Sequence, residues 1–153
     1  MQDSLDQLLN RVAHRGSWFG GGSAAALTAA LAAALLEKLV VAPKVAHALR
    51  RSRRACLKLI QQDAEAFASV IEAMRSKNRR RFVRALNAAT AVQQAVLGHS
   101  RAIQRAGRVA QRSMNRKFQS DLRCAMALAS ASGASARVLI RTNRAWLRQR
   151  TIH

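Results

Sequence analysis

The sequence predicts an all-α protein, a single-domain bundle of about five helices around a buried central helix rich in alanine and leucine. Half of the chain is hydrophobic, yet it contains one proline and no tyrosine, a composition that favours uninterrupted helices. A chain of 153 residues has the length of one domain with its own core, so residues 1–153 are expected to form one unit. Residues 20–36 carry no charge, which predicts a helix enclosed by the others.

The first helix is predicted to begin after Ser4. Ser4 and Gln7 have the spacing of a capping box, in which each side chain bonds the other residue's main-chain N–H. The apolar residues that follow have helical spacing: Leu5, Leu8, Leu9 and Val12. Gly16 is expected to lie beyond the end of this helix.

Three consecutive glycines, Gly20, Gly21 and Gly22, introduce the central helix, which is predicted to run to about Val41. Glycine permits dihedral angles, left-handed ones included, that other residues avoid, and Ser23 then lies where an N-cap is expected. The free N–H groups of such a helix start favour an anion, although a tight turn before a core helix explains the same residues. Leucines recur every four residues, at Leu27, Leu31, Leu35 and Leu39.

A long third helix is predicted from about Lys44 to Arg75. Its inward stripe alternates steps of three and four residues and contains Val45, Leu49, Ser52, Cys56, Ile60, Asp63, Phe67, Val70 and Met74. Asp63 lies in the middle of this stripe. A carboxylate that faces a helical interior must be paired, hydrogen-bonded or protonated, so both a structural and a functional role are open for Asp63.

Two further helices are expected, from about Phe82 to Met114 and from Ser120 onward, although Gly98 and Gly107 weaken the continuity of the first. Asp121 lies at the start of the last helix among many cations, which favours its ionised form. One flank of this helix carries an arginine seam, for which a solvent-facing edge and an anion-lined groove remain open: Arg123, Arg137, Arg141, Arg144 and Arg148.

The charge of the chain is strongly positive, with 27 Lys and Arg against 7 Asp and Glu. Such an excess predicts an anionic partner, whether nucleic acid, a polyanionic ligand or a membrane surface. The scarcity of aromatic residues argues against recognition of nucleic acid by base stacking and leaves contacts to its backbone. Residues 24–36 are expected to be too short a run to span a bilayer, and no signal-peptide pattern is present.

Two cysteines, Cys56 and Cys124, occur without the spacing of a disulfide framework, and the four histidines lack the spacing of metal ligands. We therefore expect a soluble, cytoplasmic protein that has no membrane association and no metal site.

Several motifs, taken in order, resemble the cyclodeaminase/cyclohydrolase family. That family includes the cyclodeaminase part of formiminotransferase-cyclodeaminase and the bacterial methenyltetrahydrofolate cyclohydrolases. The resemblance covers nearly the whole chain and rests on LDQL at residues 5–8, GGGSAAA at residues 20–26, DAEAF at residues 63–67, ALNAAT at residues 85–90, Asn115, Ser120-Asp121 and Gly133-Ala134. Each piece alone is weak, and it is the ordered set that carries the resemblance.

The resemblance implies a homodimeric helical bundle that acts on a one-carbon tetrahydrofolate derivative, its substrate, with no further cofactor. The implied reactions are ring closure of the formimino form with loss of ammonia, or hydrolysis of the methenyl form. Asp63 and Asp121 would transfer protons and are expected to meet in one pocket, within the chain or across a dimer interface. The implied substrate-binding residues are Gly20, Gly21, Gly22, Ser23, Asn115, Ser120, Arg123 and Arg137.

Some positions depart from the family pattern. Phe19 and Gln93 stand where the family commonly has proline, Arg123 replaces a glycine, and Arg137 and Arg141 replace asparagines. A second interpretation is therefore a non-catalytic basic helical protein that binds nucleic acid or another polyanion. The positive charge favours this alternative, whereas the retained glycine, Asp63 and Asp121 motifs favour a folate enzyme.

Overall fold

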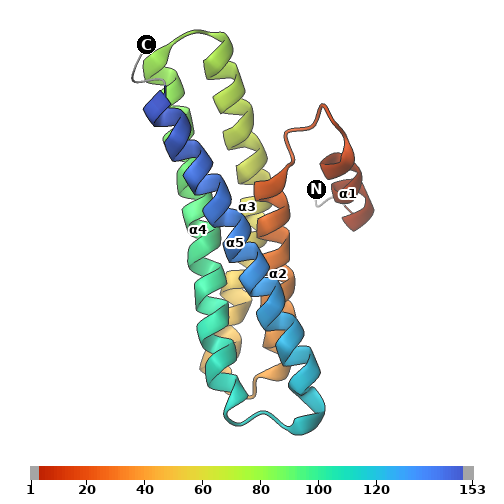
Figure 1. The fold of residues 1–153 in the computed structure, drawn as a ribbon. Helices are drawn as coiled ribbons and strands as arrows, with labels where there is room; N and C mark the ends of the chain where they lie inside the picture. Colours follow the sequence, from red (N-terminus) through yellow and green to blue (C-terminus); the bar gives the residue numbers. More distant parts are fainter. Residues whose placement is uncertain (1–3, 150–153) are drawn as a thin grey trace.

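The computed structural model describes residues 4–149, which are helical except for short connections (Figure 1). The elements are α1 (Leu5–Ala13), α2 (Gly21–Leu39), α3 (Pro43–Arg75), α4 (Arg79–Gln111), a short 3-10 helix η1 (Arg116–Phe118) and α5 (Gln119–Gln149). No strand occurs within residues 4–149. The prediction of an all-α fold with five α-helices is confirmed.

Helix α1 stands to one side of the bundle (Figure 1) and has no buried residue. The capping box predicted at its start is present. Ser4 Oγ accepts a hydrogen bond from the Gln7 N–H at 3.2 Å, and Gln7 Oε1 accepts one from the Ser4 N–H at 2.8 Å. This local motif defines where α1 begins, although α1 itself contributes little to the core.

The other four helices form the bundle, in which α2 packs against α3, α4 and α5. Helix α2 has 19 residues, whereas α3 and α4 have 33 each and α5 has 31. The three long helices consequently continue past the N-terminus of α2 (Figure 1). Beyond that point the space between them is no longer filled by a fourth helix.

Helix α2 is the most enclosed element, as predicted, and alanines form most of its buried face. The side chains in the core are mainly alanines, including Ala25, Ala26, Ala29, Ala32 and Ala33, whereas Leu31 is 51% exposed. Small side chains take up little space between helices, so the axes of neighbouring helices can lie close together without leaving cavities. The leucine repeat is thus divided between core and surface, with Leu39 buried and Leu31 exposed.

Helix α4 begins at Arg79 after the N-cap Asn78 and ends at Gln111, so it lies about three residues earlier in the chain than predicted, and neither glycine interrupts it. Gly98 borders open space, but Gly107 is buried where α4 approaches α5. A Cβ atom at residue 107 would overlap the side chain of Met126. Glycine at this position therefore permits close helix packing.

Among the helices of residues 4–149, α2 alone is long and apolar enough to cross a membrane, with a mean hydropathy of 1.3. The apolar run is thus longer than residues 24–36. Slightly more than half of it, 56%, is buried inside the bundle, a degree of enclosure that is typical of a core helix.

Candidate active site

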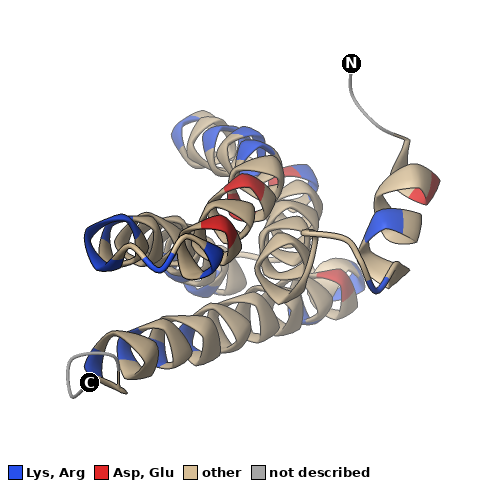
Figure 2. Cartoon of the chain, turned by 90° about the horizontal axis from the view of Figure 1, so that it is seen from above, with Lys and Arg blue, Asp and Glu red and all other residues tan. Residues whose placement is uncertain are grey.

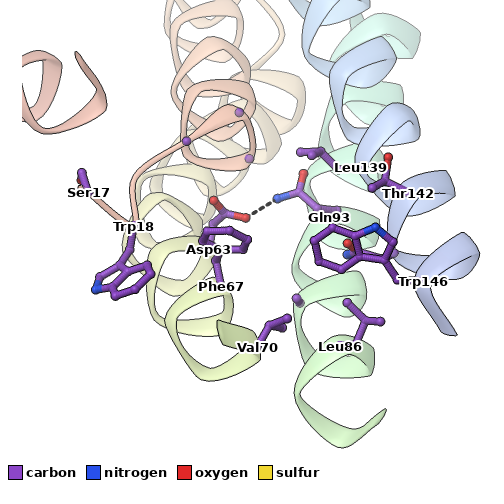
Figure 3. A pocket seen from close by; sticks show the side chains of 15 residues that line it. Ser17, Trp18, Asp63, Phe67, Val70, Leu86, Gln93, Leu139, Thr142 and Trp146 are labelled. Atoms are coloured by element: carbon purple, nitrogen blue, oxygen red, sulfur yellow. Dashed lines mark hydrogen bonds between the residues drawn. The ribbon is translucent and has the colours of Figure 1, made fainter. Parts of the chain in front are cut away.

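A cavity of about 230 Å³ lies at the N-terminus of α2, where α3, α4 and α5 continue without it (Figure 3). Its walls come from all four helices and from the connection before α2. The lining residues are Ser17, Trp18, Gly20, Gly21, Gly22, Asp63, Phe67, Val70, Leu86, Ala89, Gln93, Leu139, Thr142, Asn143 and Trp146. The shorter length of α2 thus creates the site, because a longer helix would fill it.

Asp63 of α3 reaches the first turn of α2. Its Oδ2 accepts a hydrogen bond from Ser23 Oγ at 3.0 Å, and its Oδ1 accepts one from Gln93 Nε2 at 2.6 Å. The main-chain N–H of Ser23 also bonds this carboxyl group. The start of α2 therefore does bind an anion, as free N–H groups and the helix dipole favour, but the anion is the chain's own carboxylate.

The N-cap of α2 is Gly20, with φ −143° and ψ −148°, so the expectation that Ser23 caps this helix is wrong. The left-handed dihedral angles that glycine permits are not used here, because no glycine within residues 4–149 has a positive φ. Residue 22 must be a glycine because there is no space for a side chain at this position. A Cβ atom there would overlap the side chains of Asp63 and Gln93.

Burial raises the pKa of the Asp63 carboxyl group, and hydrogen bonds from Ser23 and Gln93 oppose this rise. Asp63 is the only ionisable side chain among the lining residues of the cavity. A carboxylate that loses water without gaining a cationic partner is costly. The pocket is therefore suited to a ligand that brings N–H donors or a positive charge to Asp63.

Aromatic side chains form much of the wall around this carboxyl group, with Phe67 beside Asp63 and Trp146 across the pocket (Figure 3). Trp18 and Phe67 meet edge to face with ring centroids 6.2 Å apart, and Trp146 of α5 lines the same cavity. Aromatic rings offer a large apolar surface to a flat ligand, and their faces attract cations. Both tryptophans of the chain lie here.

Sequence reasoning placed Phe67 on the inward stripe of the third helix and noted Gln93 only as a departure from the family pattern. It did not assign Trp18 or Trp146 to a site. The composition did contain a feature that could have drawn attention to the two tryptophans. In a chain with 4% aromatic residues, two tryptophans near opposite ends are unusual, but nothing in their spacing shows that the fold brings them together.

Asp121 lies in the first turn of α5, with its side chain 43% exposed and Oδ2 3.7 Å from Lys38 Nζ. Lys38 belongs to the last turn of α2 and follows Ser23 by fifteen residues, which is roughly 22 Å along a helix axis. Asp63 and Asp121 thus lie near opposite ends of α2, and the expectation that they share a pocket within one chain is wrong. Their meeting across a dimer interface stays a prediction.

The other predicted ligand contacts divide in the same way. Gly20, Gly21 and Gly22 line the Asp63 pocket and Ser23 bonds Asp63. In contrast, the exposed residues Asn115, Ser120, Arg123 and Arg137 do not line this pocket within one chain, and their contact with a substrate stays a prediction.

Asn115 instead lines a second, mainly apolar cavity of about 260 Å³ between the α2–α3 connection and the end of α4. Its side-chain oxygen accepts a hydrogen bond from the Lys117 N–H at 3.2 Å and so caps η1. Within residues 4–149, no group of three or more His, Cys, Asp or Glu side chains could hold a metal ion.

The fold and the pocket together define a helical bundle with a buried carboxyl group in an aromatic-walled cavity. A model of the formiminotransferase-cyclodeaminase family matches residues 4–152, and the chain belongs to this family. A search of curated protein sequences found no significant match.

Among solved structures, the chain is similar to formiminotetrahydrofolate cyclodeaminase from Thermotoga maritima, with a TM-score of 0.84 and 23% sequence identity. The match covers 98% of this chain and 82% of that protein. At this identity the likeness shows a shared fold.

Proposed function

We propose that the protein binds a one-carbon tetrahydrofolate derivative in the Asp63 pocket and catalyses a reaction at its one-carbon group. The observation that carries this proposal is a partly buried carboxyl group, without a cationic partner, between aromatic walls. A formimino group is an amidine that accepts a proton, and a methenyl bridge carries a delocalised positive charge. Either group would supply the positive charge that the pocket lacks, and a flat pterin ring suits aromatic walls.

In cyclising deamination, N10 of the folate attacks the formimino carbon and a bond from that carbon to N10 forms. The bond to the formimino nitrogen then breaks. This nitrogen enters as =NH and leaves as ammonia, so it gains two protons, one from N10 and one from solvent. We assign proton transfer to Asp63, because a carboxyl group with a raised pKa both accepts and donates protons closer to neutral pH. Hydrolysis of a methenyl group would use the same residue to accept a proton from water.

The proposal is tested by titrating the protein with formimino- and methenyl-tetrahydrofolate while tryptophan fluorescence is recorded. Both tryptophans line the pocket, so their emission reports binding at this site. We expect saturable quenching and slow formation or loss of the methenyl chromophore on mixing. The absence of saturable quenching and of binding heat at millimolar ligand would contradict the proposal.

We also propose a homodimer that forms through the outer face of α2 and α5. Leu31 and Val138 are about half exposed on these helices, and small residues line a shallow cavity between the helices. Gly21 and Leu139 line both this cavity and the Asp63 pocket, so a second copy on this face would lie beside the pocket. Sedimentation equilibrium should give a dimer for the wild type and a monomer for Leu31→Arg, and a wild-type monomer would contradict it.

A second candidate function is binding to a polyanion such as nucleic acid. For either function we propose a reducing, cytoplasmic compartment. Polyanion binding is favoured by the spread of Lys and Arg over several helices of the bundle (Figure 2) and by the exposure of Arg101, Arg105 and Arg108 along α4 and of Arg112 just after it. If binding is electrostatic, affinity for DNA or RNA should fall steeply with salt and show little sequence preference. Negligible binding at low salt would remove this candidate.

A further inference from the structure

The hydroxyl group of Ser23 faces two oxygen atoms at the same distance. Ser23 Oγ lies 3.0 Å from the main-chain oxygen of Ile60 and 3.0 Å from Oδ2 of Asp63. A hydroxyl group has a single hydrogen, so it donates to only one of these oxygens at a time. A main-chain oxygen never donates. The second hydrogen bond is therefore complete only when Asp63 carries a proton and donates it to Ser23.

Gln93 contacts the other oxygen of Asp63 in a different manner. Its side chain is 2% exposed and Nε2 donates to Oδ1 at 2.6 Å, a short distance that is typical of a bond to a charged acceptor. Gln93 Oε1 is buried and has no hydrogen-bond partner in the described chain. The amide group is thus oriented as a donor to Asp63 even though this leaves its own oxygen unsatisfied.

We propose that Gln93 and Ser23 are positioning residues that divide the two oxygens of Asp63 between a fixed hydrogen bond and a reversible one. Gln93 holds Oδ1 as an acceptor at all times, so the proton of Asp63 resides on Oδ2. When Asp63 is ionised, Ser23 donates to Oδ2. When Asp63 is protonated, Oδ2 donates to Ser23, and the Ser23 hydroxyl turns to Ile60.

Both protonation states then keep Oδ1 and Oδ2 hydrogen-bonded without movement of any heavy atom. The surrounding elements add no competing charge: α2 contributes glycines and Ser23, α4 contributes Gln93 and apolar side chains, and α5 contributes Thr142, Asn143 and apolar residues. No Lys, Arg, His or second acidic side chain lines the cavity. Protonation of Asp63 is therefore governed by burial and by these two neighbours.

This inference deepens the proposed function, on which its catalytic meaning rests, but its test requires no substrate. Protein labelled with ¹³C at aspartate carboxyl and isoleucine carbonyl carbons is titrated by NMR. The Asp63 signal is assigned with Asp63→Asn and the Ile60 signal with Ile60→Val. We expect the Ile60 carbonyl signal to shift with the same midpoint as Asp63, because Ile60 gains the Ser23 hydrogen bond when Asp63 is protonated.

Three variants separate the two roles. Ser23→Ala should abolish the shift of the Ile60 signal while Asp63 still titrates. Gln93→Met removes the donor to Oδ1 and should raise the pKa of Asp63 by about one unit or more, since this bond favours the charged form. The exposed neighbour Gln94 provides the matched control, and Gln94→Met should leave both signals unchanged.

An Ile60 signal that stays constant while Asp63 titrates would overturn the reversible bond, and this result needs only the wild type. An unchanged pKa of Asp63 in Gln93→Met would overturn the role of Gln93. Neither result bears on folate binding, which the fluorescence titration measures separately. Conversely, if the Ile60 and Asp63 signals shift with the same midpoint but the protein binds no folate, the inference is supported and the proposed function is contradicted.

Discussion

Acidic side chains lie near both ends of α2, but their carboxyl groups have different surroundings. At the N-terminal end, Asp63 is enclosed and bonded by the neutral groups of Ser23 and Gln93, and burial raises its pKa. At the C-terminal end, Glu37 bonds the guanidinium groups of Arg50 and Arg53 at 2.8 and 3.0 Å. Arg53 is the main cause of a lowered pKa for Glu37.

Asp121, also at the C-terminal end, is exposed and pairs with Lys38. The comparison teaches that net charge says little about a site. In a chain with a formal charge of +20, the pocket with the most enclosed carboxyl group contains no cation, because the arginines lie on outer faces. Chemistry in which a carboxyl group holds and releases a proton is favoured by the raised pKa at the N-terminal end of α2 and disfavoured by the lowered pKa at the C-terminal end.

The largest expected difference between the two ends is in catalysis. Asp63→Asn should lower turnover of a one-carbon folate by about 100-fold or more, the usual contribution of a general acid or base. If one chain completes the site, Asp121→Asn should change turnover by less than about twofold, because an exposed ion pair contributes little. Steady-state kinetics with circular dichroism as a folding control measures both. An equal loss in Asp121→Asn would instead indicate that Asp121 reaches the pocket across a dimer interface.

The next difference concerns packing at the glycines. Gly22→Ala should destabilise the protein by about 1–3 kcal/mol, because the new methyl group overlaps Asp63 and Gln93 in an enclosed site. Gly98→Ala is the matched control in an open part of α4, and it should stabilise the protein by up to about 1 kcal/mol through helix propensity. Urea denaturation of both variants measures the contrast, and equal effects would refute it.

A smaller effect is expected in the pH dependence of stability. Because the folded pKa of Asp63 is raised, the fold favours its protonated form. The free energy of unfolding of the wild type, relative to Asp63→Asn, should be highest below about pH 4, the ordinary range of an aspartate. It should decrease as the pH rises through the folded pKa. Denaturation series of the two proteins test this, and a relative stability that increases with pH would contradict it.

The smallest effect is expected for the ion pair at the other end. Replacing Asp121 by Asn should change the free energy of unfolding by less than about 0.5 kcal/mol, since the side chains of Asp121 and Lys38 are both substantially exposed. Repeating the denaturation in high salt should reduce even this difference. A loss of several kcal/mol would show that Asp121 has further partners in the assembled protein.

The sequence by itself determined features that depend on near neighbours and on periodicity. The capping box at Ser4 and Gln7 is local, and the helix from Pro43 to Arg75 follows from its apolar stripe, which also placed Asp63 toward the interior. The burial of α2 followed from its lack of charge. These properties are set by residues within a few turns of one helix, so spacing alone reveals them.

Only the tertiary structure decided which face of α2 is buried, why Gly22 must be a glycine, and where the site lies. The relative lengths of the helices open the pocket beyond α2, and the return of α5 brings Trp146 to the cavity that Trp18 also lines. The same geometry places Asp121 near the far end of α2 from Asp63. Contacts between residues far apart in the chain depend on how complete helices pack, which the periodicity of a single helix does not specify.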